Sequence, residues 1–524
     1  LKLKQLIIDK KKMHKRYKNT GNLHYYHKFT HLRQLSRLES RMSYKSFIVE
    51  TESKLNLNPK KFWQFVAQKR ADNDLPSNMI YNDIHATNGP DIAELFAKHF
   101  SSVYSDTAPN VPVLNYTRTV DLNECNISLV DVFNALSALS DNSGTGPDGF
   151  PEILLKRCKF VLTRPLCHLF NLSLSSGVFP DSWKLSYLRP IFKSGIKTDI
   201  CNYRPISILS HIPKIFESII TKKISPLFKN LLIDEQHGFR SSRSTITNLL
   251  SYTDTIVRAL EDNTQVDVLY TDFAKAFDRV NHSLLLAKLR AVGLRDPFLS
   301  FIESYLTGRE QRVKINDHIS NVIKVTSGVP QGAHLAPLLF NIFINDIIVS
   351  PNTQFWLFAD DNKILKSIKS HNDCSLFQSD IDSFSEWCRT NCMELNVNKC
   401  KIMSFYRTRK PIQFAYNLNG VDLSTVTLIK DLGLILDTKL SFREHIENAV
   451  NKSLKMLGFI HRITTDFNNI RTLKTLYCSL VRPHLEYASV IWSPFYATHI
   501  NRIESVQHRF LRIVAWKMGL VREN

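Results

Sequence analysis

The stretch Phe358-Ala359-Asp360-Asp361 decides how the rest of this sequence is interpreted. Apolar residues lie on both sides of it, Phe355 to Leu357 before and Ile364-Leu365 after. Short apolar runs around a polar pair predict two strands joined by a tight turn, and Asp tolerates turn geometry. Adjacent carboxylates at such a turn repel each other unless a cation neutralises them. This density of hard oxygen ligands suits Mg²⁺, although an acidic surface turn would contain the same pair.

A third carboxylate, Asp272, strengthens the metal interpretation. It follows the run Val266–Thr271, which is mostly β-branched and apolar, so we expect Asp272 at the C-terminal end of a strand. The segment after it leads toward a helix expected around Leu284–Leu289. The three carboxylates can share a site only if the two strands are neighbours in one sheet.

Three segments resemble the motifs of reverse transcriptases. Residues Thr271–Asp278 resemble motif A, Ser327–Gly332 resemble motif B, and Phe358–Asp361 resemble motif C. Their order and spacing also agree with that family. The likeness is strongest to the second open reading frame of non-LTR retrotransposons, in the jockey-like and CR1-like group, and it covers nearly the whole chain.

The resemblance implies an RNA-directed DNA polymerase that copies element RNA into DNA from a 3′-hydroxyl primer. It assigns catalysis and metal binding to Asp272, Asp360 and Asp361, the last in a more peripheral role. The implied cofactor is a pair of Mg²⁺ ions, for which Mn²⁺ can substitute. The implied partners are template RNA, a DNA primer or target, and deoxynucleoside triphosphates.

The same resemblance suggests which residues contact the nucleotide. The candidates are Phe273, Phe277, Gln331, Gly332, Lys193, Arg204, Arg240, Arg243 and Lys399. Phe277 stands where reverse transcriptases carry an aromatic steric gate against the 2′-hydroxyl, but a core Phe would suit the same turn. We expect one or two of the fingers cations to meet the triphosphate, and the others to form structural ion pairs or touch template phosphates. Lys399 could protonate pyrophosphate or simply contact a phosphate.

The implied fold is α+β, a right-hand polymerase whose antiparallel palm sheet packs on helices. We expect a basic helical linker or N-terminal extension over 1–120, fingers over 121–260, and a palm over 261–430 with motifs A to D. A primer-grip hairpin and a helical thumb would then occupy 431–524. The Gly- and Pro-rich loop 144–151 is interpreted as structural.

Charge points to a polyanionic partner. The formal charge is +20, and a surplus of this size suits a polyanion. The length of 524 residues is too great for one core and predicts two to four domains or subdomains, while the hydrophobic content of 43% favours globular folding. Residues 1–50 hold 13 Lys and Arg against 3 Asp and Glu, and residues 451–524 hold 11 against 4. Nucleic acid is the first candidate and an anionic membrane surface the second, while a solvated helical face could explain either cluster alone.

Nine cysteines without paired spacing predict reduced thiols in an intracellular protein, at a nuclear site of integration if the resemblance holds. The cluster Cys388, Cys392 and Cys400 lacks a suitable histidine for zinc. No run of 18 apolar residues predicts a membrane span. The chain begins at Leu1 in helical character, which suggests a fragment of a longer product with an endonuclease domain upstream.

Two other interpretations stay open. One is a catalytically silent nucleic-acid-binding remnant, and the other is a group II intron maturase-like protein. Several positions depart from the expected motifs: Ala333 and His334 in motif B, Asn362 after motif C, Cys400 and Asp431. None of these departures removes a predicted metal ligand, and the intact carboxylates favour the polymerase.

Overall fold

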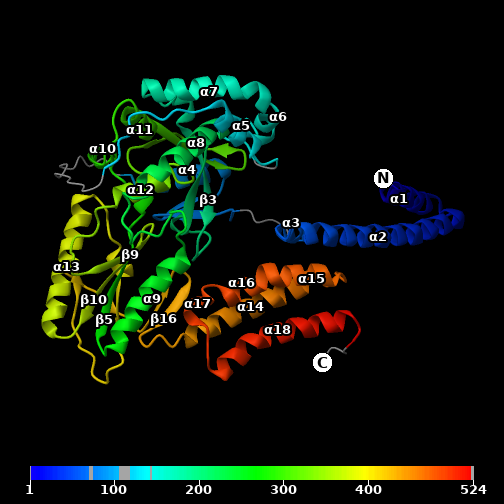
Figure 1. The fold of residues 1–524 in the computed structure, drawn as a ribbon. Helices are drawn as coiled ribbons and strands as arrows, with labels where there is room; N and C mark the ends of the chain where they lie inside the picture. The colour runs from blue at the N-terminus through cyan, green and yellow to red at the C-terminus, as the bar shows by residue number, and fades with distance from the viewer. Residues whose placement is uncertain (1, 70–74, 105–118, 142–143, 521–524) are drawn as a thin grey trace. The chain divides into compact units, whose positions relative to one another are not determined.

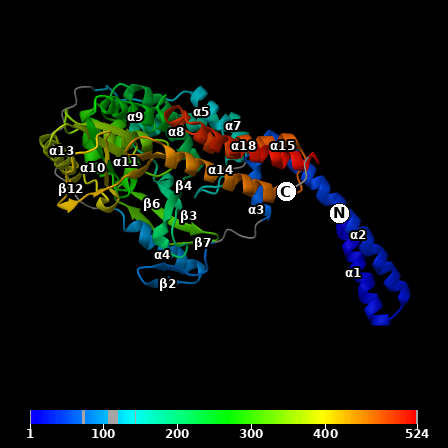
Figure 2. The same cartoon turned by 90° about the horizontal axis from the view of Figure 1, so that it is seen from below.

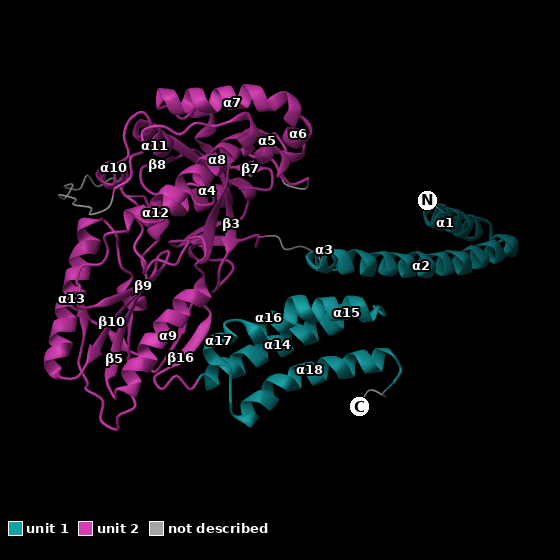
Figure 3. Cartoon of the chain, viewed as in Figure 1, with its two compact units in different colours: residues 1–74, 442–524 teal, residues 75–441 magenta. Residues whose placement is uncertain are grey.

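The computed structural model describes residues 2–69, 75–104, 119–141 and 144–520 as a mixed α+β fold (Figure 1). The chain forms two compact units (Figure 3). The larger unit is residues 75–441, and the smaller one joins residues 1–74 to residues 442–524. The boundary expected at residue 260 therefore lies inside one unit. The segment expected as 1–120 is divided between the two units.

A five-stranded sheet in the order β14-β11-β5-β10-β9 is the centre of the larger unit. Its strands are β14 (Ser424–Thr425), β11 (Lys401–Phe405), β5 (Gln265–Thr271), β10 (Asp361–Ile368) and β9 (Gln354–Phe358). All seven residues of β5 are buried, as expected for a β-rich apolar run at the centre of a sheet. β10 is antiparallel to both β5 and β9, so the strands that end in the carboxylates are neighbours.

Two helices cover opposite faces of this sheet. Alternation along β10 directs Lys363 toward Asn248 of α9 (Thr245–Glu261). The next residue, Ile364, belongs instead to the core that includes Phe377 of α13 (His371–Thr390). Figure 1 shows α9 and α13 on either side of the strands. Because both faces are buried, the strands lack the simple polar alternation of a half-exposed sheet.

A second five-stranded sheet has β4-β3-β6-β7 in order, with β8 also paired to β6. Its strands are β3 (Leu185–Phe192), β4 (Tyr203–Ile208), β6 (Arg309–Ile315), β7 (His318–Ile319) and β8 (Ile323–Val325). In the part of the chain that the structure describes, three two-stranded ribbons accompany the sheets: β1 (Met79–Tyr81) with β2 (Ile84–Ala86), β12 (Asn417–Leu418) with β13 (Val421–Asp422), and β15 (Leu428–Asp431) with β16 (Leu434–Asp437). The last ribbon is the hairpin predicted as the primer grip.

The remaining helices of the larger unit pack around these sheets. They are α4 (Gly89–Ser101), α5 (Leu129–Ser137), α6 (Glu152–Arg157), α7 (Lys159–Ser176), α8 (His211–Phe228), α10 (His282–Ala291), α11 (Phe298–Leu306) and α12 (Ala336–Phe343). Motif B leads into α12, and seven of its eight residues are buried. Apolar residues with helical spacing continue to Ile348 and would suit a longer helix, but α12 ends at Phe343. The chain turns after Phe343, where the Asn345 side chain accepts from Ile233 and donates to Leu231.

The smaller unit is helical and brings the two ends of the chain together. It contains α1 (Lys2–Thr20), α2 (Leu23–Leu57), α3 (Lys61–Lys69), α14 (Arg443–Ile463), α15 (Ile470–Leu476), a π-helical turn (Tyr477–Val481), α16 (Arg482–Glu486), α17 (Ser489–Trp492) and α18 (Ala497–Lys517). Helices α1 and α2 lie side by side as a hairpin (Figure 2). This unit holds 30 Lys and Arg against 12 Asp and Glu, so it carries 18 of the net 20 positive charges.

Glu52 anchors α2 to the C-terminal helices. Its carboxylate Oε1 accepts the backbone N–H groups of Asn468 and Asn469, each at 2.8 Å, just before α15. Thr472 donates its hydroxyl to the Glu52 carbonyl at 3.2 Å. Nearby, the rings of Phe65 and Phe467 lie 5.2 Å apart. A buried carboxylate that caps a helix start explains how a polar residue can sit in this interface.

Glu52→Ala is therefore expected to destabilise the protein by about 1–3 kcal/mol, because two N–H groups lose their acceptor. Glu50→Ala is the matched control, since that side chain is exposed and pairs only locally with Lys54. Its expected effect is within about 0.5 kcal/mol. Thermal unfolding followed by far-ultraviolet circular dichroism measures both. Equal losses for the two variants would contradict the anchoring role of Glu52.

Candidate active site

The predicted hairpin places two carboxylates at its tip. Phe358 of β9 pairs with Asp361 of β10, so Ala359 and Asp360 form the turn between the strands. Ala359 has φ +55°, a left-handed conformation that closes the tight connection. The turn therefore holds Asp360 half-buried and Asp361 exposed at its end.

Asp272 reaches the same place from the neighbouring strand. Thr271, the last residue of β5, pairs with Asn362, so Asp272 emerges beside the tip. Burial raises the pKa of Asp360, and the Asp272 carboxylate raises it further. Although part of the Asp361 side chain reaches solvent, desolvation by the surrounding protein raises its pKa to about 6, with Asp360 as the second cause. The mutual effect on pKa indicates that the three predicted carboxylates share one electrostatic environment.

Three predicted cations face this environment. Lys399 lies just before β11, and its Nζ is 3.0 Å from Asp272 Oδ2. Lys193 follows β3 and Arg204 lies in β4. Burial lowers the pKa of Lys193, Arg204 and Lys399 lower it further, and Asp272 and Asp360 raise it. The second sheet thus supplies positive charge opposite the carboxylates of the first.

The donor set suits Mg²⁺ bound partly by substrate. Among the described residues no group of three or more His, Cys, Asp and Glu side chains is arranged to enclose a metal ion, and this includes the cysteine cluster near residue 390. Mg²⁺ is commonly held by one or two carboxylates together with waters and substrate phosphates, so a closed protein cage is not required. Both polar atoms of the Asn362 amide, beside Asp361, are buried without a hydrogen bond to the described residues. The residues present therefore fit a divalent cation that arrives with its own oxygen ligands.

Motif B is joined to the motif A turn. The backbone N–H groups of Gly328 and Val329 donate to Val280 and Phe277 at 2.7 and 2.8 Å. The Gln331 amide donates to both carboxylate oxygens of Asp278, at 2.9 and 3.0 Å. Burial raises the pKa of Asp278 to about 6. The Gln331 side chain, predicted to contact the nucleotide, is thus oriented by a carboxylate of motif A.

Gly332 and the two motif A phenylalanines have distinct surroundings. Gly332 has φ +94°, and a Cβ there would lie 3.4 Å from the Ser207 carbonyl oxygen. The Phe277 ring is half-buried and stacks on Phe340 with centroids 4.3 Å apart. Phe273 is buried against Phe384 instead. Of the two rings, only Phe277 retains a partly exposed face that a sugar could meet.

Arg240 and Arg243 are held by their own loop. Arg240 donates to the backbone carbonyls of Ile233, Gln236 and Lys229. Arg243 forms an ion pair with Asp234 at 3.3 Å. These contacts are the structural ion pairs and hydrogen bonds that the sequence left open as an alternative to triphosphate binding. Lys193 and Arg204 are the better placed candidates.

A residue that sequence reasoning did not single out, Gln236, clamps the turn itself. Its Oε1 accepts from the backbone N–H of both Ala359, at 2.9 Å, and Gly238, at 2.7 Å. The neighbouring backbone pairs with β9 through His237 and Leu357. A Cβ on Gly238 would lie 2.2 Å from the Ala359 nitrogen, so only glycine fits. Sequence reasoning pointed to this segment only through Arg240 and Arg243, and the contact of Gln236 with Ala359 depends on the fold.

Carboxylates at the joined ends of two antiparallel strands, facing cations from a second sheet, are the arrangement of a nucleotidyl-transfer site. A sequence profile of the family "Reverse transcriptase (RNA-dependent DNA polymerase)" matches residues 193–461, and the chain belongs to this family.

The chain is also similar to polymerases of mobile elements. The chain is 27% identical over 409 residues to the probable RNA-directed DNA polymerase from transposon BS of Drosophila melanogaster, covering 74% of this chain and 44% of that protein. It is also 27% identical over 403 residues to the RNA-directed DNA polymerase from mobile element jockey of the same species, with the same two coverages. The chain thus spans less than half the length of these relatives. A Candida tropicalis telomerase structure aligns with a TM-score of 0.35 and 11% identity, over 65% of this chain and 64% of that one.

Gly238→Ala is expected to reduce primer extension by at least about tenfold, because the added methyl group collides with the turn backbone. Gly144→Ala is the matched control, since nothing lies within 4 Å of a Cβ at that position. Single-turnover extension and thermal unfolding should be measured together. Normal extension by the Gly238 variant would contradict the proposed close contact between this loop and the carboxylate turn.

Proposed function

We propose that this chain extends a DNA primer on an RNA template, as the polymerase portion of a non-LTR retrotransposon protein. The observation that carries the proposal is the meeting of Asp272 with Asp360 and Asp361 at the ends of neighbouring strands. Family membership and the similarity to the transposon BS and jockey polymerases support it.

The carboxylates would hold the cofactor between them. Asp272 and Asp360 come from two strands and would hold a pair of Mg²⁺ ions, with Asp361 at the edge of the pair. Such ions, or Mn²⁺ in their place, stabilise the attacking and leaving oxygens of an in-line phosphoryl transfer. Burial and the neighbouring carboxylates raise the pKa of Asp360 and of Asp361, and a bound cation would stabilise their ionised forms.

Positive side chains would receive the deoxynucleoside triphosphate. Lys193 and Arg204 face the carboxylates from the second sheet and would pair with the phosphates. Lys399 forms an ion pair with Asp272. This ion pair would open if a cation took the place of Lys399 or if phosphate took the place of Asp272. The Lys399 ammonium would then be free to donate a proton toward the leaving pyrophosphate.

The proposed right-hand organisation assigns residues 121–260 to fingers and 261–430 to a palm. The hairpin β15–β16 would grip the primer, and the helices from α14 onward would form the thumb. Surplus charge in the unit of residues 1–74 and 442–524 supports binding of template and primer phosphates there. None of the described helices combines the length and apolarity needed to cross a bilayer.

Asp360→Asn is expected to lower Mg²⁺-dependent extension by at least about 10³-fold and to leave RNA affinity nearly unchanged. The carboxylate serves the metal, whereas affinity comes mainly from Lys and Arg. Asp422→Asn, an exposed change in β13, is the control and should retain full extension. Primer extension and filter binding measure the two effects. Wild-type extension by the Asp360 variant would remove this turn from the active site.

Phe277→Ala is expected to raise the ratio of ribonucleotide to deoxynucleotide incorporation by about tenfold or more, since removal of the ring relieves a clash with one hydroxyl. Deoxynucleotide addition should fall only modestly. Competitive incorporation on a primed RNA measures the ratio. An unchanged ratio accompanied by a lower melting temperature would instead make Phe277 a core residue that stacks on Phe340.

A further inference from the structure

A buried lysine lies directly behind the carboxylate turn. Lys363 follows Asp361 by two positions on β10, so both side chains leave the same face of the strand, with Cα atoms about 7 Å apart. Lys363 is 1% exposed. An ammonium group taken this far out of water requires compensation by specific partners.

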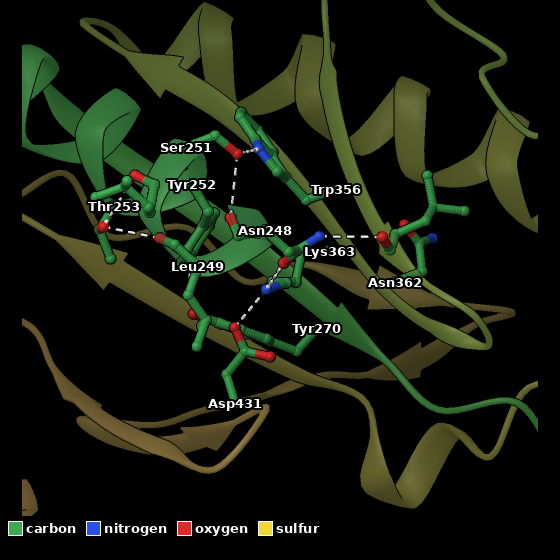
Figure 4. Close-up of polar contacts among 12 residues, drawn as sticks. Asn248, Leu249, Ser251, Tyr252, Thr253, Tyr270, Trp356, Asn362, Lys363 and Asp431 are labelled. Atoms are coloured by element: carbon green, nitrogen blue, oxygen red, sulfur yellow. Dashed lines mark hydrogen bonds and ion pairs between the residues drawn. The ribbon is translucent and has the colours of Figure 1, made fainter. Parts of the chain in front are cut away.

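Three groups compensate Lys363 (Figure 4). Its Nζ lies 2.5 Å from Asp431 Oδ2 and 2.8 Å from Asn248 Oδ1. The same nitrogen lies 4.6 Å from the centre of the Tyr252 ring, within range of a cation–π interaction. Asp431 ends β15 and is itself 6% exposed, so the pair joins the β15–β16 hairpin to the hairpin that carries the active-site carboxylates.

The surroundings hold this pair in place. The hydroxyl groups of Tyr252 and Tyr270 lie 2.5 Å apart, and the Trp356 indole donates to Ser251. Asn248 also donates its amide to the Leu357 carbonyl, next to the tip of β9. Because strands on both sides and α9 above all contribute, the ammonium has little freedom to move away from the turn.

The pair matters for charge because it is close to a concentration of negative groups. Lys363 lies two positions from Asp361 on β10, and Asp431 contacts the Lys363 ammonium at 2.5 Å. Asp431 alone would add a fourth carboxylate behind the metal site, and Lys363 alone would add a repelling cation. Held together and away from water, their charges nearly cancel at the turn.

Resting on the function proposed above, we propose that Lys363 and Asp431 form a charge-balancing pair that sets the affinity of the Asp272, Asp360 and Asp361 site for divalent cations. The residues act through the carboxylates and touch neither metal nor substrate. Replacing a buried ion pair by apolar side chains is often neutral for stability, so the test measures cation affinity and not stability alone.

The test is Mn²⁺ binding to the full chain without nucleic acid, measured by electron paramagnetic resonance. Asp431→Asn leaves a net positive charge behind the turn, so the dissociation constant is expected to rise about fivefold. Lys363→Met leaves a net negative charge, so the constant is expected to fall by a similar factor. In the double variant the charges again cancel, and the constant should return to within about twofold of wild type.

A second ion pair, formed by a buried lysine and a half-buried aspartate, provides the matched control. Lys288 and Asp346 lie 2.7 Å apart, and the Lys288 ammonium also lies over aromatic rings, 4.8 Å from the centre of Phe343. Asp346→Asn removes the same kind of ion pair from another part of the larger unit. It should leave the Mn²⁺ constant unchanged even if the melting temperature falls.

Opposite shifts that cancel in the double variant support the proposal, and the Asp431 variant alone tests it if Lys363→Met does not fold. Shifts in the same direction, no shift, or an equal shift in the Asp346 control would overturn it. Asp360→Asn separates this failure from failure of the proposed function. If that variant neither loses extension nor weakens Mn²⁺ binding, the metal site itself is misplaced.

Discussion

Antiparallel pairing of β5 with β10 is the constraint on which the candidate site depends. The register sets Thr271 opposite Asn362, and this single choice brings Asp272 beside a turn almost 90 residues later in the chain. Side chains alternate along a strand, so a one-residue slip would turn every side chain of β10 to the other face. Burial of both sheet faces, by α9 and by the α13 core, makes such a slip costly. The core thus fixes the active-site geometry without contributing a reactive group.

Carboxylates gathered at one edge of the sheet repel one another, and cations on the surrounding elements reduce that repulsion. Burial and then repulsion between carboxylates raise the pKa of Asp360 and of Asp361, and cations reach them from several elements. Lys399 contacts Asp272 directly, while Lys193 lies in the same field from the second sheet. Behind the tip, the Lys363–Asp431 pair adds two charges that oppose each other. In the proposed function, divalent cations and nucleotide phosphates would complete the charge balance of this site.

The two compact units carry very different net charges. The unit of residues 75–441 is close to neutral, while the unit formed by the chain ends carries nearly the whole excess. Phosphate binding requires many exposed cations, whereas a metal site requires a few buried and balanced ones. In the proposed function, this separation would allow each unit to satisfy its own requirement. Contacts such as those of Glu52 with the residues before α15 hold the two basic ends of the chain together in one compact unit.

The sequence by itself determined the strands around residues 265–271 and 354–368, the three carboxylates, and the family that their motifs resemble. These follow from local chemistry: apolar runs, adjacent acids and turn residues are visible in a linear string. Only the tertiary structure decided that the chain ends form one unit, that Gln236 clamps the Ala359 turn, and that Asp431 meets Lys363. Each of these contacts joins residues more than 60 positions apart. The partner of a polar side chain at such a distance cannot be identified from the local sequence. Asp431 was visible only as a departure from the family pattern, and its role became readable because β15 places it against β10.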